Sequence, residues 1–393
     1  MNERHGAFSC IDLFCGAGGL SLGFRAMGFN ILAANDFDEV AAETYKRCHP
    51  DTFFLPGSIE KIAGMDFLAA SGLERGELDC LIGGPPCQAF SIYNHKRGMH
   101  DGRSGLFREY LRIVEDLAPK LVVMENVTGI LSAGGGAAVE ELHLRLSGLG
   151  YVVQQKTLKA EEYGVPQERR RVFFVGTRVG DQCFSFPEAT HVPGVRPFVT
   201  VKEAILDLPV LEMASGMEDM PYSMKPFCEY QEMMRANSLT VYNHVAPYLS
   251  PINQKRLRHI PQGGSWRDIP VELLPAGMKA ARRCDHTKRY GRLHPEGLSS
   301  TILTRCDLHW GAYIHPTQER TLTPREAARL QSFPDRIHFL GSRIDQFKQI
   351  GNAVPPLLAK AVATSVRDHL RGIAAPRQEG WLFSPCEMVQ VGT

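Results

Sequence analysis

Residues 83–91 read Gly-Gly-Pro-Pro-Cys-Gln-Ala-Phe-Ser, and the apolar run Leu78 to Ile82 just before them predicts a buried strand. The two glycines and two prolines take the backbone abruptly out of that strand and stiffen it. The first side chain beyond this rigid turn is the thiol of Cys87. Because α/β sheets bind ligands at the carboxyl ends of their strands, Cys87 is placed to act as a nucleophile. The alternative is an inert cysteine in a turn.

The N-terminal region has the order strand, glycine turn, helix. An apolar strand is expected over Phe8 to Phe14, followed by Gly16, Gly18 and Gly19 and then by helical spacing over Leu20 to Met27. Such a turn lets a ligand approach the backbone, because no Cβ atoms stand in the way. The pattern lacks the third glycine of the dinucleotide fingerprint, which argues against a nicotinamide-dependent dehydrogenase.

The second predicted strand, Asn30 to Ala34, ends in Asn35-Asp36-Phe37. An acidic residue at this place is positioned to accept hydrogen bonds from ribose hydroxyls, and Phe37 is suited to stack on an adenine ring. The alternative for Asp36 is to cap the helix that follows.

Four further strands are expected, and two of them bring candidate catalytic residues. They cover Thr52–Leu55, Lys120–Met124, Tyr151–Leu158 and Arg171–Thr177. Glu125 follows the second of these, and burial there raises a carboxyl pKa so that the neutral acid can donate a proton. A helix cap or an ion pair is the alternative for this residue. Alternation along an extended Gln167-x-Arg169-x-Arg171 puts both arginines on one side.

Six motifs in this order resemble those of the DNA (cytosine-5-)-methyltransferases. They are Asp12-Leu13-Phe14-x-Gly16-x-Gly18-Gly19, Pro86-Cys87-Gln88, Glu125-Asn126-Val127, Gln167-x-Arg169-x-Arg171, Arg320-x-Leu322-Thr323-Pro324 with its helix to Gln331, and Gly351-Asn352-x-Val354. The resemblance covers about residues 12–178 and 320–370. It implies an α/β fold, with a doubly wound, Rossmann-like sheet that binds S-adenosyl-L-methionine (SAM) and a smaller, irregular target-recognition domain. We expect the first domain at 1–186, completed by 346–393, and the second at 187–345.

The resemblance also implies roles for individual residues. Cys87 adds to C6 of a flipped-out cytosine in double-stranded DNA, Glu125 acts at N3, Arg169 orients the base carbonyl and Arg171 supports them. The methyl group goes to C5, leaving S-adenosyl-L-homocysteine. Cofactor contacts are expected from Phe14, Gly16, Gly18, Gly19, Asp36, Phe37, Ser58, Ile59, Leu106, Asn352 and Val354. Ser58 departs from the family, whose members often have an acidic residue there.

Charge is distributed unevenly along the 393 residues, although the net charge is only +1, which excludes a uniformly basic nucleic-acid binder. Residues 1–80 carry 6 basic against 12 acidic side chains, whereas residues 245–320 carry 12 against 6. The basic region therefore predicts a face for a polyanion. DNA contacts are expected from Ser91, Lys96, Arg97, Arg103, Gln262, Gly263, Gly264, Arg267, Arg282, Arg283, Lys288, Arg289, Arg292 and Arg305.

The remaining expectations concern the setting of the protein. The ten cysteines form no metal-type pattern, and no signal peptide or long apolar span is present, so we expect a cytoplasmic protein without metal or membrane attachment. A monomer is expected, with a cognate restriction endonuclease as a functional partner. Two alternatives within the family stay open: a methyltransferase acting on tRNA, and a DNA-binding homologue without activity.

Overall fold

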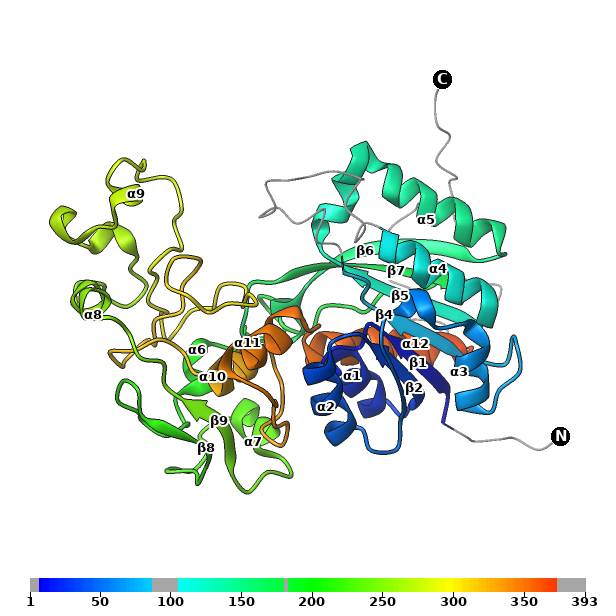
Figure 1. The fold of residues 1–393 in the computed structure, drawn as a ribbon, viewed down its shortest axis with the longest axis horizontal. Helices are drawn as coiled ribbons and strands as arrows, with labels where there is room; N and C mark the ends of the chain where they lie inside the picture. The colour runs from blue at the N-terminus through cyan, green and yellow to red at the C-terminus, as the bar shows by residue number, and fades with distance from the viewer. Residues whose placement is uncertain (1–6, 87–104, 180–182, 373–393) are drawn as a thin grey trace.

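A seven-stranded sheet forms the core of the larger lobe (Figure 1). The computed structural model describes residues 7–86, 105–179 and 183–372. The strand order is β3-β2-β1-β4-β5-β7-β6, with only β7 running against its neighbours. The strands are β1 (Ser9–Leu13), β2 (Asn30–Asp36), β3 (Phe53–Pro56), β4 (Cys80–Gly83), β5 (Leu121–Asn126), β6 (Val152–Lys159) and β7 (Arg170–Thr177).

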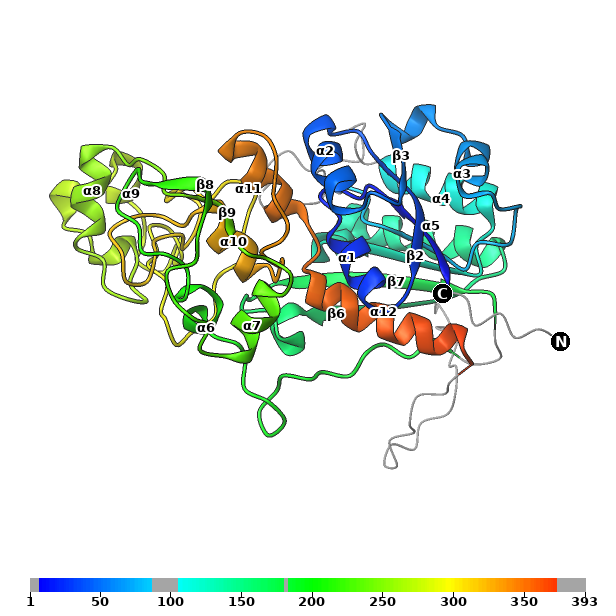
Figure 2. The same cartoon turned by 90° about the horizontal axis from the view of Figure 1, so that it is seen from below.

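Helices cover both faces of this sheet, which confirms the doubly wound α/β fold. Successive residues of β1 point to opposite faces, so Ile11 packs with one set of helices and Cys10 with the other. The first face carries α3 (Gly64–Ser71), α4 (Leu106–Leu117) and α5 (Ala137–Gly148); α1 (Gly19–Ala26) and α12 (Pro356–Leu370) pack against the second (Figure 2). Helix α2 (Glu39–Cys48) connects β2 to β3.

The order of the strands decides where a ligand can bind. The chain runs outward from β1 through β2 to β3, then returns to place β4 and β5 on the other side of β1. Connections therefore diverge between β1 and β4, and open α/β sheets bind ligands outside the carboxyl ends of the strands at such a point. The glycine turn after β1 and the Gly-Gly-Pro-Pro segment after β4 meet there.

The smaller lobe is irregular, with short elements between long loops (Figure 1). It contains a two-stranded antiparallel sheet and several short helices: α6 (Val201–Ile205), β8 (Gly216–Met220), α7 (Glu229–Arg235), β9 (Val241–Val245), α8 (Pro251–Leu257), α9 (Ala276–Lys279), α10 (Pro324–Leu330) and α11 (Arg343–Asn352). Helix α10 begins as its sequence predicts, since Thr323 caps it in a capping box with Glu326 and Pro324 occupies the first turn.

Buried charges hold the smaller lobe together around α10. Arg320 forms two hydrogen bonds to the Glu326 carboxylate, and Arg329 binds both Asp207 and Asp335; all of these groups are buried. Arginine donors satisfy carboxylate lone pairs bidentately, which is what permits burial of so much charge. The contact between Arg329 and Asp207 joins segments more than 100 residues apart.

Candidate active site

The carboxyl ends of β1 and β2 form the expected cofactor side of the site. The Asp36 carboxylate accepts hydrogen bonds from the backbone N–H of Gly16 and of Asp38, both at 2.8 Å. Asp38, and not Asp36, caps α2 by accepting from the N–H groups of Val40 and Ala41. Since a carboxylate has about four lone-pair sites, Asp36 keeps acceptor capacity for a ligand. Burial raises its pKa.

The surroundings of Asp36 fit the adenosine half of SAM. The Phe37 ring beside it is 64% exposed, which leaves its face open for stacking. Ile59 is buried near the end of β3, and Ser58 donates a hydrogen bond to Glu60 Oε2. Leu106 is half-buried at the start of α4, and Phe14 has a left-handed backbone (φ 56°) at the end of β1.

The C-terminal motif packs directly on the glycine turn. A Cβ atom at Gly19 would collide with the carbonyl oxygen of Val354, so only glycine permits this contact. Val354 is buried and Asn352 is exposed. The residues expected to hold SAM therefore come together from β1, β2 and the segment before α12.

A buried hydroxyl–carboxylate chain beneath the glycine turn was not expected from the sequence. Ser21 donates to Asp12 Oδ2 at 2.6 Å, and its Oγ lies 2.8 Å from the hydroxyl oxygen of Tyr45. Burial raises the pKa of Asp12 to about 7, which the Ser21 hydroxyl partly opposes. The sequence carries one sign of this chain, because Asp12 is an acidic residue within the otherwise apolar strand predicted over Phe8–Phe14.

Glu125 lies at the carboxyl end of β5, facing the Gly84-Pro85 segment. A Cβ atom at Gly84 would stand 3.0 Å from Glu125 Oε2. The neighbouring Asn126 donates from Nδ2 to the Pro85 carbonyl oxygen at 3.1 Å, which fixes the course of the chain toward Cys87. Burial raises the pKa of Glu125, against the opposing effect of Arg171 and Arg169. Cys87 itself lies outside the described residues, as do Ser91, Lys96, Arg97 and Arg103.

The two arginines of the Gln-x-Arg-x-Arg segment have different surroundings, which corrects the expected roles. Arg171 Nε forms an ion pair with Glu125 Oε1 at 2.8 Å. Arg169 is buried, and its terminal nitrogens donate to the carbonyl oxygens of Ile302, Gly351 and Ala353. With its terminal donors used by the backbone, Arg169 is not available to orient a base carbonyl. Arg171 is the arginine that reaches the acid.

A glutamine pair completes this junction between the lobes. Gln167 Nε2 donates to Gln331 Oε1 at 2.8 Å, and Gln331 Nε2 donates to the Ile350 carbonyl oxygen at 2.8 Å. Both side chains are fully buried. The segment that carries Arg171 is thereby fastened to α10 and to the end of α11, a contact that sequence reasoning missed.

The basic residues predicted in the smaller lobe are not equivalent, and Arg292 requires a correction. Its side chain is only 6% exposed, and it donates to carbonyl oxygens including those of Ile260 and Leu257 and pairs with Glu319. A guanidinium used in this way supports the loop and does not face DNA. Arg305 is exposed, and Gln262 lines an open pocket of about 640 Å³ at the Gly263-Gly264 turn.

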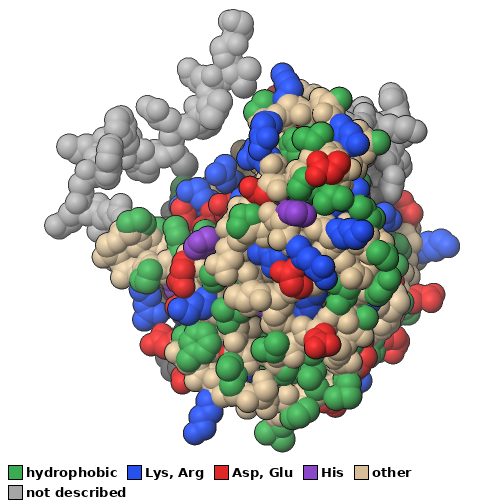
Figure 3. Space-filling view, turned by 90° about the vertical axis from the view of Figure 1, so that its left-hand side faces the viewer, with side chains coloured by type: hydrophobic (Ala, Val, Ile, Leu, Met, Phe, Trp, Pro, Cys, Tyr) green, Lys and Arg blue, Asp and Glu red, His purple; other side chains and the backbone are tan. Residues whose placement is uncertain are grey.

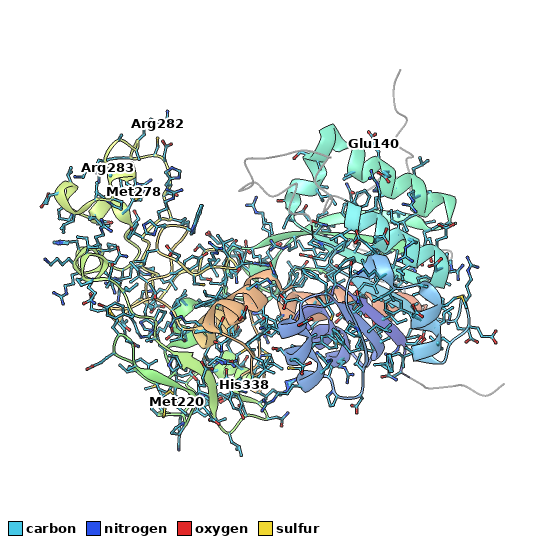
Figure 4. All side chains as sticks on the ribbon, viewed as in Figure 1. Glu140, Met220, Met278, Arg282, Arg283 and His338 are labelled. Carbon is cyan, nitrogen blue, oxygen red and sulfur yellow. The ribbon has the colours of Figure 1, made fainter. Side chains whose placement is uncertain are left out.

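Arg282 and Arg283 lie at the tip of this lobe, near Met278, whereas Glu140 stands on the other lobe (Figure 4). Arg267 is partly buried, and its carbonyl oxygen accepts from Arg283. The outer end of the lobe intersperses basic, acidic and hydrophobic side chains (Figure 3).

Within residues 7–86, 105–179 and 183–372, no helix is long and apolar enough to cross a bilayer. Nor does any group of three or more His, Cys, Asp or Glu side chains in this part of the chain form a candidate metal site.

Comparison with known proteins identifies the family. Residues 8–368 match the family described as C-5 cytosine-specific DNA methylase. Type II methyltransferase M.AgeI of Thalassovita gelatinovora is 37% identical over 91% of this chain and 98% of its own length, and M.DdeI of Desulfomicrobium norvegicum is 35% identical over 92% and 89%. A solved E. coli prophage protein, described as a DNA modification methyltransferase, superposes with a TM-score of 0.75 at 26% identity, covering 93% of this chain and 100% of its own.

The strand order, the glycine turn and the acid beside the Pro-Pro turn now have one explanation. The chain belongs to the C-5 cytosine-specific DNA methylases, enzymes that transfer the methyl group of SAM to C5 of cytosine in DNA.

Proposed function

We propose that Cys87, Glu125 and Arg171 carry out the reaction by covalent catalysis. The observation that supports this most strongly is the Glu125–Arg171 pair beside the Gly84-Pro85 turn that leads to Cys87. C5 of cytosine is a poor nucleophile, so a thiolate must first form a bond to C6 and push electrons toward N3. Glu125, with its raised pKa, supplies the proton or hydrogen bond that N3 then needs.

In this proposal, Arg171 positions the catalytic acid and the base. Its ion pair with Glu125 holds the acid, and its remaining guanidinium donors are suited to a carbonyl oxygen of the base. When bound, SAM supplies the methyl group that the activated C5 accepts. Loss of the C5 proton then restores the C5=C6 double bond, and the bond between C6 and the Cys87 sulfur breaks, which releases the thiolate. A stacked cytosine cannot reach these groups, so the base must leave the helix, at a cost of a few kcal/mol.

SAM is held, in this proposal, by Asp36 and Phe37 through the adenosine and by the Gly16–Gly19 turn through its amides. Ser58, Ile59, Leu106, Asn352 and Val354 complete the pocket. Residues 1–186 with 346–393 form the catalytic domain, and 187–345 form the target-recognition domain. Supporting this division, the stretch 245–320, with 12 basic against 6 acidic side chains, lies in the second region, and the proposed catalytic residues lie in the first.

The biological setting is proposed from the relatives. M.AgeI and M.DdeI, two of the similar proteins, are Type II methyltransferases, so a cognate restriction endonuclease is the expected functional partner, and the protein acts in the cytoplasm as a monomer. A tRNA substrate is the weaker alternative: the chain resembles S. pombe Dnmt2 only in fold, at 15% identity and a TM-score of 0.60.

Trapping the covalent intermediate tests the proposal. A DNA duplex with 5-fluorocytosine at the methylated position should give a stable protein–DNA adduct that contains the transferred methyl group, because fluorine blocks the final elimination. Cys87→Ser should form none, whereas Cys284→Ser, at an exposed cysteine, should trap as the wild type does. An adduct mapped by mass spectrometry to another cysteine contradicts the proposal.

A further inference from the structure

Three of the arginines expected to contact DNA are occupied by partners inside the protein. Arg282 pairs with Asp285 at 3.1 Å, and Arg283 donates to the Arg267 carbonyl oxygen at 2.8 Å. Arg292 is buried among carbonyl oxygens. A guanidinium that must release an internal partner before it binds a base loses part of the binding energy. These residues are therefore poor candidates for reading a base edge.

Arg289 differs from them. Its guanidinium lies over the indole ring of Trp310, 5.7 Å from the ring centroid. Within residues 7–86, 105–179 and 183–372, this guanidinium forms no hydrogen bond or ion pair; the hydrogen bonds of Arg289 come from its backbone. Trp310 is 49% exposed, which is unusual for a tryptophan. Stacking on an aromatic face orients a guanidinium plane and leaves its N–H edge free.

The loop that carries Trp310 is held rigidly. The ring of His309 bridges Asp307 and Tyr290, since Nδ1 lies 2.7 Å from Asp307 Oδ1 and Nε2 lies 2.7 Å from the tyrosine hydroxyl. The backbone N–H of Tyr290 donates to the Leu308 carbonyl oxygen at 2.7 Å. Tyr290 is fully buried, so the residues next to Arg289 and Trp310 are anchored in the core of the lobe.

The Arg289–Trp310 pair also lies next to the segment that carries the catalytic arginine. Lys288 Nζ is 3.4 Å from Glu168 Oε2, and the Thr301 hydroxyl donates to the Glu168 carbonyl oxygen at 2.6 Å. Glu168 is three residues before Arg171, which pairs with Glu125. These loops lie between the two lobes (Figure 1). A DNA base contacted by Arg289 would therefore be close to the cytosine being methylated.

We propose that Arg289, held by stacking on Trp310, reads a guanine close to the target cytosine. The guanidinium edge donates two hydrogen bonds to guanine O6 and N7 in the major groove, and Trp310 is the specificity-determining platform that keeps the edge in place. This inference rests on the proposed function, because it assumes a duplex substrate whose cytosine reaches Glu125. It assigns a role to Trp310, an exposed aromatic residue that no catalytic step uses.

Methylation of a randomised duplex library, read by bisulfite sequencing, tests the inference. The full-length wild type should require guanine at one position near the cytosine. Arg289→Lys keeps the charge but loses the bidentate contact, and Trp310→Leu removes the aromatic face. Both should relax that same position, by roughly 5- to 150-fold in relative methylation. Trp310→Phe keeps an aromatic face and should keep the preference.

Arg336→Lys is the matched control, because Arg336 is an exposed arginine of the smaller lobe that is not among the expected DNA contacts. It should leave every base preference as in the wild type. Unchanged preference in Arg289→Lys overturns the inference, and so does an equal loss at all sites, which would mark a phosphate contact. Relaxation at different positions by the Arg289 and Trp310 variants refutes the platform role. A wild-type protein that marks no defined DNA sequence would instead contradict the proposed function itself.

Discussion

Glu125 is the side chain on which the proposed chemistry depends most directly after the thiol. Its carboxyl group is buried, and the raised pKa keeps more of it protonated than an exposed glutamate would be. Glu125→Gln preserves shape and hydrogen-bonding capacity but cannot transfer a proton. We expect the single-turnover methylation rate to fall by roughly 10²-fold or more, with SAM binding retained.

The control for Glu125 is Glu140→Gln, an exposed carboxyl group on α5. Its rate should match the wild type. A near-normal rate for Glu125→Gln would assign Glu125 a purely structural role as the partner of Arg171. Calorimetric titration with SAM separates a loss of chemistry from a loss of cofactor binding.

Asp12 predicts a pH dependence of stability. Its pKa is raised from 3.8 to about 7, so between these values the folded protein binds a proton that the unfolded chain has released. The free energy of unfolding from this group therefore falls as pH rises through that window, by up to roughly 4 kcal/mol at 1.36 kcal/mol per pKa unit. Asp12→Asn cannot titrate and should lose this decline.

Urea denaturation at pH 5 and at pH 8 measures the effect. Buried histidines such as His315, whose pKa burial lowers to about 4, contribute in the opposite direction, so the difference between wild type and variant is the informative quantity. From pH 5 to pH 8, the free energy of unfolding of Asp12→Asn should rise relative to that of the wild type. Asp51→Asn, at an exposed carboxylate, should follow the wild type; identical pH profiles for all three proteins would refute the prediction.

At the level of strands and helices, much of the fold was predictable because its signals are local. Apolar runs of strand length gave all seven strands of the large sheet, and Thr323-Pro324 gave the start of α10. The alternation of side chains along a strand predicted that Arg169 and Arg171 lie on one side. It could not show that the Arg169 guanidinium would donate its hydrogen bonds to backbone carbonyl oxygens.

The missed contacts share one physical cause. Gln167 meets Gln331 across 164 residues of chain, and Arg292 is buried by loops that have no periodicity. Side-chain identity alone does not distinguish an arginine that binds DNA from one that binds backbone carbonyls, since both uses require the same donors. Such contacts are decided by tertiary packing, which carries no short-range pattern.

A substitution at Gly19, the first residue of α1, tests how tightly the glycine turn is packed. A methyl group at Gly19 would overlap the Val354 carbonyl oxygen, so the turn or the C-terminal segment must shift. We expect Gly19→Ala to lower the free energy of unfolding by about 1–3 kcal/mol, as overpacking does, and to weaken SAM binding. Gly148→Ala in α5, where a Cβ atom meets nothing within 4 Å, should be neutral or stabilising. Equal urea midpoints for both variants would contradict this packing argument.

At the scale of the whole molecule, we propose that the larger lobe carries the chemistry and the smaller lobe the recognition. The proposed catalytic groups contact features that every cytosine has, so we expect sequence preference to come from the smaller lobe. Replacing residues 187–319 with the same region of a relative of different specificity should transfer that preference. The junctions keep Gln331, Arg169 and α11, so the hydrogen bonds from Gln167 to Gln331 and from Arg169 to Gly351 survive.

Sequencing of the DNA methylated by this chimera gives the answer. Methylation at the donor's sites is the expected result. An active chimera that still marks the original sequence would place specificity in the catalytic lobe. The wild-type region regrafted into the same junctions is the control for damage to Ser299, which bonds to Pro166 across the lobes.

The contact between Val354 and Gly19 has a consequence for synthesis on the ribosome. The glycine turn is made early, but the segment that packs on it leaves the ribosome only after more than 300 further residues, which takes on the order of 20–70 s at 5–20 residues per second. During that time α1 lacks the surface that α12 provides. The nascent chain therefore passes through a long interval with an exposed apolar face and an incomplete cofactor site, when chaperones are most needed and methylation cannot begin.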